Sequence, residues 1–153
     1  MREILYRRMA CDRFMVIDIQ PALIESKIKR IDKFRIGNIP EMFREVMKTV
    51  TVKNYTNKRK AVIGEYIDFL RDNNLLERKE IAAMQIVEEK NWAVSQSVIE
   101  TVKDEEQKVS DIKDSFRLLF NRMNKGLLQL KAELLAKKAE MELTPLFRSN
   151  IYK

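Results

Sequence analysis

The sequence predicts an all-α protein of four to five helices, with a long coiled-coil-like C-terminal helix or a helical hairpin. Three observations predict this fold. Only three glycines and three prolines interrupt 153 residues, whereas sheet proteins need many turns built on such residues. The helix-favouring residues Lys, Glu, Leu, Met and Ala are abundant. Apolar residues also repeat every three or four positions through most of the second half of the chain, which is the spacing of one helix face.

The first elements surround two prolines. Residues 2–19 are ambiguous, because 2–9 suits a short helix whereas the dense apolar run at 13–19 could be a strand or a buried turn. A helix is expected to begin near Pro21, since proline is common at a first helical position, and to end at Gly37 in a left-handed cap. The chain is expected to become helical again after Pro40.

A connector is expected next. Residues 49–57 are rich in β-branched side chains and asparagine, which disfavour a helix. Asn57 is then placed to cap a helix over 58–71. The sequence RDNN at 71–74 is expected to end that helix.

The longest uninterrupted segment is 75–144, which contains no proline and one glycine. Its sustained apolar pattern is typical of a long helix or a helical hairpin, and the natural place for a hairpin turn is 103–108. Such a helix exceeds the width of a small domain, so part of its apolar stripe is expected to bind a partner protein or a second copy. The residues of this predicted partner-binding stripe are Phe116, Leu119, Met123, Leu130 and Leu134.

Charge is distributed unevenly along the chain. The net charge is +7 and the pI is about 9.5. Basic residues are in excess over 1–60 and 115–153, whereas 61–114 is acidic. A basic balance favours a polyanionic partner, and the alternation of sign also allows the chain to pair with itself. We divide the chain into a basic N-terminal helical region (1–74), a long helical or coiled-coil-like region (75–144) and a tail (145–153).

The composition excludes most catalytic chemistry. The chain has no histidine, which removes the usual general base and the histidine metal ligands. Its one cysteine, Cys11, permits no intrachain disulfide and no ordinary zinc site. Three scattered glycines cannot build a phosphate-binding loop. The sequence therefore predicts a protein that is not an enzyme and that uses neither a cofactor nor a metal.

The same reasoning bears on localisation. No run approaches the roughly 18 apolar residues that span a bilayer. Arg7 and Arg8 interrupt the apolar residues of the N-terminus, so it lacks the core of a signal peptide. We expect a protein that is cytoplasmic or nucleoid-associated, is not secreted and does not bind membranes.

The stretch VKNYTNKRKAV at 52–62 is the main candidate for nucleic-acid binding. Its cations fall in the first turn of the predicted helix, where they oppose the helix dipole unless an anion such as a phosphate binds there. The aromatic side chain of Tyr55 can stack on a base. Further cations of the basic N-terminal third extend the patch. The candidate nucleic-acid-binding residues are Lys53, Tyr55, Lys58, Arg59, Lys60, Lys29, Arg30 and Lys33.

Three functional hypotheses follow. In the first, the chain is a non-enzymatic helical subunit of a nucleic-acid-handling assembly. Its basic N-terminal half contacts the phosphate backbone, and its C-terminal helices bind partner proteins. In the second, helices at 40–50 and 58–71 form a helix-turn-helix DNA-binding regulator. In the third, the chain is a structural or coat-type oligomer. The size, the long C-terminal helices and the basic helical start are similar to those of small all-helical subunits of replication or RNA-guided complexes, such as GINS-type subunits. This resemblance implies the first hypothesis.

Overall fold

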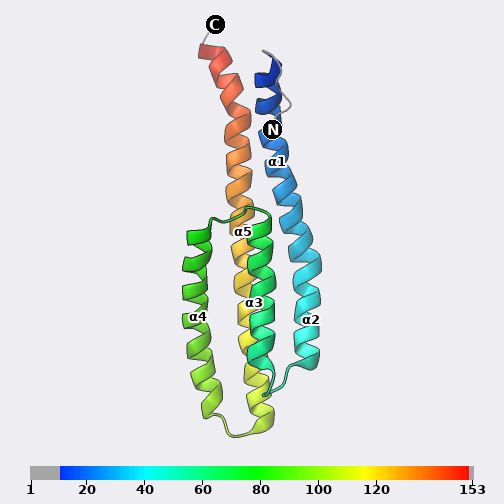
Figure 1. The fold of residues 1–153 in the computed structure, drawn as a ribbon, viewed down its shortest axis with the longest axis vertical. Coiled ribbons are helices and arrows are strands. Elements are labelled where there is room, and N and C mark those ends of the chain that lie inside the picture. The colour runs from blue at the N-terminus through cyan, green and yellow to red at the C-terminus, as the bar shows by residue number, and fades with distance from the viewer. Residues whose placement is uncertain (1–10, 152–153) are drawn as a thin grey trace. The chain divides into compact units, whose positions relative to one another are not determined.

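The computed structural model describes the backbone of residues 11–151 and the side chains of residues 21–143. The described backbone is helical with short connections and contains no strand, which confirms the all-α prediction (Figure 1). Its helices are α1 (Cys11–Lys33), α2 (Ile39–Thr49), α3 (Tyr55–Asp72), α4 (Arg78–Thr101) and α5 (Glu105–Ile151). A π-helical segment, η1 (Phe34–Asn38), joins α1 to α2 without a loop.

The chain divides into two compact units, which we describe separately. Unit 1 contains the described parts of Met1–Lys33 and Leu128–Lys153, and unit 2 contains Phe34–Leu127. Helix α1 belongs to unit 1, and α2, α3 and α4 belong to unit 2. Helix α5 is 47 residues long and contributes to both units. The units combine segments that are distant in the sequence, so they differ from the three regions defined by composition.

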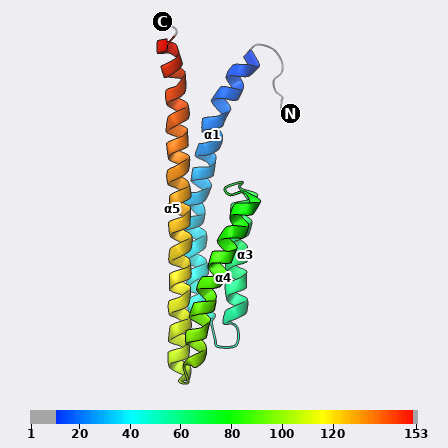
Figure 2. The ribbon, with the colours of Figure 1, turned by 90° about the vertical axis from the view of Figure 1, so that its left-hand side faces the viewer.

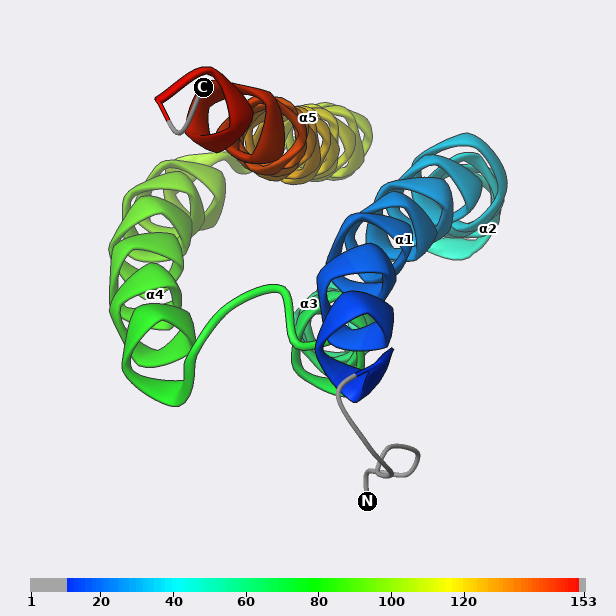
Figure 3. The same ribbon diagram turned by 90° about the horizontal axis from the view of Figure 1, so that it is seen from above.

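Unit 2 is an up-and-down four-helix bundle of α2, α3, α4 and the first half of α5 (Figure 1). Viewed along the helices, these four elements stand at four corners (Figure 3). Aromatic side chains link them across the core. The ring centroids of Phe43 on α2 and Phe120 on α5 lie 5.6 Å apart. The Trp92 ring on α4 lies 5.9 Å from Tyr55 on α3 and 5.7 Å from Phe116 on α5.

Two helix boundaries predicted in the first third of the chain are wrong. Helix α1 already includes residues 13–19, which are therefore neither the strand nor the buried turn that we expected, and it continues through Pro21. Gly37 is not a left-handed cap, since no described glycine has a positive φ. The helix instead widens at η1, directly before Pro40. A π turn shifts the hydrogen-bond register, so the helix can continue around the missing proline N–H.

Helix α3 begins earlier than the predicted cap at Asn57. Thr51 and Asn54 close the preceding turn with reciprocal hydrogen bonds. The N–H of Thr51 donates to Asn54 Oδ1 over 2.7 Å, and the N–H of Asn54 donates to Thr51 Oγ1 over 3.2 Å. These two bonds hold the turn at 51–54, and α3 begins directly after that turn, at Tyr55. At its other end, the predicted stop is confirmed, and Asn74 adopts a left-handed φ of 52°.

Helices α4 and α5 show that the second half of the chain is a helical hairpin. The turn lies between Thr101 and Glu105, at the start of the segment where we expected it. Asp104 ends the turn as a helix cap, because its Oδ2 accepts the Gln107 N–H over 3.1 Å. Helix α5 then runs through Pro145, so the predicted tail is helical as far as its described backbone extends.

Unit 1 pairs α1 with the second half of α5, and the two helices run antiparallel and side by side (Figure 2). Ion pairs join them. Lys131 Nζ lies 2.9 Å from Asp32 Oδ1, and Lys138 Nζ lies 3.2 Å from Glu25 Oε2. Among the side chains of α1 that the structure describes, the buried apolar ones are Ile24, Ile28 and Ile31.

Candidate functional site

Two of the predicted nucleic-acid-binding residues lie in the interior of unit 2. Tyr55 is 8% exposed, and Arg59 is 4% exposed with its guanidinium carbon 5.0 Å from the centre of the Trp92 ring. Arg59 also donates to Glu89 Oε1 over 2.7 Å and to the Glu88 carbonyl over 3.3 Å. A side chain enclosed in this way cannot stack on a base or reach a phosphate. The assignment of both residues to a nucleic-acid surface is therefore corrected: they stabilise the bundle.

The other cations of this stretch are in different environments. Lys58 is half-buried, and its Nζ lies 3.4 Å from both carboxylate oxygens of Glu45. Lys53 and Lys60 are exposed. The stretch therefore combines one buried cation, one paired cation and two exposed lysines. The remaining candidates, Lys29, Arg30 and Lys33, are exposed residues of unit 1.

The residues of the predicted partner-binding stripe also lie in two different environments. Phe116 and Leu119 are 0% exposed and Met123 is 2% exposed, so unit 2 itself encloses them. Their assignment to a partner surface is wrong. The sequence showed an apolar stripe on α5 but not the three helices that cover it. Leu130 and Leu134 are half-buried in unit 1. Over residues 105–143, where the side chains of α5 are described, the exposed large apolar residues are Leu118, Leu128, Leu135 and Leu143.

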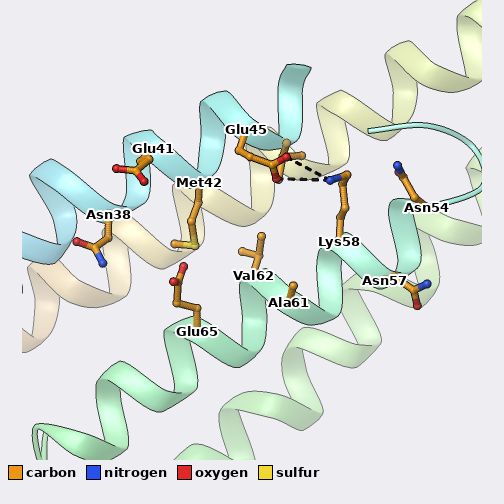
Figure 4. Close-up of a pocket in the computed structure, with 11 residues that line it drawn as sticks. Asn38, Glu41, Met42, Glu45, Asn54, Asn57, Lys58, Ala61, Val62 and Glu65 are labelled. Atoms are coloured by element: carbon orange, nitrogen blue, oxygen red, sulfur yellow. Dashed lines mark hydrogen bonds and ion pairs between the residues drawn. The ribbon is translucent and has the colours of Figure 1, made fainter. Parts of the chain in front are cut away.

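A groove between α2 and α3, here called the α2–α3 groove, lies on the surface of unit 2 (Figure 4). Its volume is about 620 Å³. Apolar side chains from both helices line its floor, namely Met42, Val46, Ala61 and Val62. Polar and charged side chains surround this floor, namely Glu41, Glu45, Glu65, Lys58, Asn38, Asn54 and Asn57.

Because α2 and α3 are antiparallel neighbours in a bundle, their arrangement does not favour a helix-turn-helix, whose helices cross steeply.

Contacts within the α2–α3 groove favour the ionised form of Glu45. The Thr49 hydroxyl donates to Glu45 Oε2 over 2.7 Å. This hydrogen bond, followed by the nearby Lys58 ammonium, holds the pKa of Glu45 below its ordinary value. Glu45 is therefore ionised at neutral pH and is matched by Lys58.

Glu41 and Glu65 give the groove its net charge. Both are exposed, and none of the described side chains forms an ion pair with either one. The Glu65 side chain extends from α3 toward Met42 of α2, so a carboxylate stands beside the apolar floor (Figure 4). The groove is thus apolar at its base and negative at its rim. It suits a cation with an apolar body, whereas our sequence analysis expected an anion-binding surface at Lys58.

The sequence alone does not predict this groove, because its lining residues come from two helices. Glu41 and Glu45 are four residues apart and so share one face of α2, which the sequence does show. Glu65 completes the site only because α3 folds back along α2. Nothing in the local pattern reveals that pairing.

Among the described residues, no group of three or more cysteine, aspartate or glutamate side chains is arranged to hold a metal ion. None of the described helices combines the length and the apolar character that a membrane span requires.

Comparisons with known proteins assign no family to this chain. No protein-family model, no curated protein and no solved structure matches it.

Proposed function

We propose that this chain is a non-enzymatic helical subunit that binds a partner protein by receiving a basic amphipathic helix of that partner in the α2–α3 groove. The observation that carries this proposal is the combination of an apolar floor with a negatively charged rim. Helix-in-groove recognition uses these two features, since apolar anchors provide affinity and surrounding charges select the partner.

The dimensions of the groove suit such a partner. Its lining residues on α2 follow a spacing of three and four from Asn38 to Val46, and those on α3 do so from Asn54 to Glu65. The groove therefore follows both helices for about two turns or more, a length that matches consecutive anchors on one helix face. Lysines or arginines flanking those anchors would lie near Glu41 and Glu65.

A peptide-binding experiment tests the groove. The probe is a synthetic amphipathic helical peptide of leucine and lysine, labelled for fluorescence anisotropy. We expect Glu41→Lys with Glu65→Lys to weaken binding about tenfold or more, because two attractive contacts become repulsive. We expect Ala61→Phe, a change at an exposed position in the groove, to weaken binding by filling the space that an anchor occupies.

The control changes the net charge equally at another place. Glu100→Lys with Glu142→Lys alters two exposed carboxylates outside the groove. This variant should bind the peptide nearly as well as the natural chain in moderate salt, where distant charges are screened. If it weakens binding as much as the groove variant does, the attraction is a general charge effect and the groove is not the site.

A second candidate function, contact with a nucleic-acid backbone, is favoured by the charges of α1. Lys138 and Lys131 of α5 neutralise Glu25 and Asp32, the two carboxylates of the described α1 side chains. The hydrogen bond and charge of Lys138 lower the pKa of Glu25, and Lys29 adds to this effect. Lys29 Nζ also lies 3.7 Å from Glu25 Oε1, and the described side chains of α1 include four cations against these two carboxylates. This supports the nucleic-acid-handling assembly as the setting in which the subunit acts.

Salt-dependent retention on duplex DNA tests this second candidate. We expect Lys29→Glu with Lys33→Glu to reduce retention, and the slope of log affinity against log salt to become shallower by about 0.9 for each phosphate that the variant no longer neutralises. Lys79→Glu with Lys90→Glu, at exposed positions of α4, is the matched control. Equal reductions in both variants would contradict a role for α1.

A further inference from the structure

A second pocket in unit 2 lies among α3, α4 and α5, away from the α2–α3 groove, and we call it the Tyr66 pocket. Its volume is about 310 Å³, at the lower end of the range for small-molecule sites. Its walls are largely apolar, with Ile63, Ile67, Met84 and Met123 among the lining residues. An apolar pocket of this kind needs only a few polar groups to orient a ligand.

The Tyr66 hydroxyl is a polar group of the pocket that has no hydrogen-bond partner among the described residues. Tyr66 lines the pocket and is only 5% exposed. Burial, and secondarily the negative charge of Glu88, raises the pKa of Tyr66 to about 12. The hydroxyl therefore keeps its proton at neutral pH and is a hydrogen-bond donor. The side chain is buried, but its hydroxyl oxygen is open to the pocket, so an acceptor on a molecule in the pocket can reach it and receive its hydrogen bond.

Gly126 makes room for this hydroxyl. A methyl group at position 126 would lie 2.8 Å from the Tyr66 hydroxyl oxygen, closer than real side chains approach. Gly126 also lines the pocket, and it stands within α5, where glycine is intrinsically unfavourable. The missing side chain lets the hydroxyl lie against the α5 backbone at the pocket wall.

Each charged residue that lines the pocket is held in an ion pair, and Glu89 Oε1 accepts from Arg59 over 2.7 Å. Arg122 Nε and Nη2 donate to the two carboxylate oxygens of Glu88 over 2.6 and 2.8 Å. Because this pair is bidentate, neither residue presents a net charge to a ligand. We propose that the Tyr66 pocket binds a small, uncharged, mainly apolar molecule that accepts a hydrogen bond from the Tyr66 hydroxyl. This site is independent of the proposed partner-binding groove.

Two isosteric probes test the inference on the full chain. Acetophenone carries a carbonyl acceptor, whereas α-methylstyrene has a methylene group in its place. Titrations followed by backbone amide chemical shifts should locate acetophenone at residues 63–67, 84–91 and 122–126. We expect Tyr66→Phe to weaken acetophenone binding about three- to tenfold, the range for one lost hydrogen bond, and to leave α-methylstyrene binding unchanged.

A second variant keeps the test decisive if Tyr66→Phe fails to fold. Val87→Phe changes a pocket residue that is exposed, so it fills the pocket without altering the core. It should weaken both probes, whereas Val94→Phe, at an exposed position of α4 outside the pocket, should weaken neither. The inference is overturned if neither probe binds up to its solubility limit or if the shifts lie elsewhere. It is also overturned if a folded Tyr66→Phe binds acetophenone unchanged.

Discussion

Replacement of Phe116 by alanine is expected to lower the free energy of unfolding by about 3–5 kcal/mol, the range for truncating a fully buried phenylalanine. The side chain is 0% exposed, and its ring centroid lies 5.7 Å from Trp92 and 6.4 Å from Phe120. The substitution removes apolar packing area and leaves a cavity that close-packed helices fill only in part. Urea unfolding followed by circular dichroism measures the decrease.

Leu118→Ala is the matched control for this prediction. Leu118 lies on the same helix but is 56% exposed, so its truncation should change the unfolding free energy by less than about 0.5 kcal/mol. The two variants also separate core packing from partner binding. If Phe116→Ala left stability unchanged and only abolished association with another protein, the burial of Phe116 would be the wrong description and a partner surface the right one.

The elements that the sequence predicted well depend on local signals. The turn near Asp104 and the stop after Asp72 have caps or left-handed residues that are visible in the sequence. The all-α class follows from the scarcity of breakers. The early start of α3 at Tyr55 was missed because it depends on the turn that Thr51 and Asn54 close with reciprocal hydrogen bonds, and the β-branched and asparagine residues there suggest a longer connector. The helix through Pro40 was missed because a π turn leaves no compositional sign.

The functional residues were harder to predict, because their roles depend on tertiary pairing. Arg59 belongs to a run of cations, and no local pattern shows that it faces Trp92 and two glutamates. Phe116 belongs to an apolar stripe that would look identical whether a partner or the same chain covered it. Glu65 joins the α2–α3 groove from a different helix. Sequence periodicity identifies a buried face, but it does not identify what buries it.

A buried ionic network holds three helices of unit 2 together, and its central carboxylate gives the second large prediction. Glu88 on α4 has a side chain 13% exposed, accepts two hydrogen bonds from Arg122 on α5, and lies 3.8 Å from Arg59 Nη2 on α3. Replacing Glu88 by leucine leaves two cations without that partner. We expect the unfolding free energy to fall by roughly 3 kcal/mol, the lower end for breaking a buried pair, since Arg122 is partly exposed.

The neighbouring residue and a double variant distinguish this network from a surface effect. Glu89 also pairs with Arg59, but its side chain is 66% exposed, so Glu89→Leu should cost less than about 1 kcal/mol. Adding Arg122→Leu to Glu88→Leu should recover part of the stability, because it removes the cation that lost both of its acceptor oxygens, whereas Arg59 keeps Glu89. Chemical unfolding of all three variants measures these differences. Equal decreases for Glu88→Leu and Glu89→Leu would mean that water reaches the network and that packing alone holds the three helices.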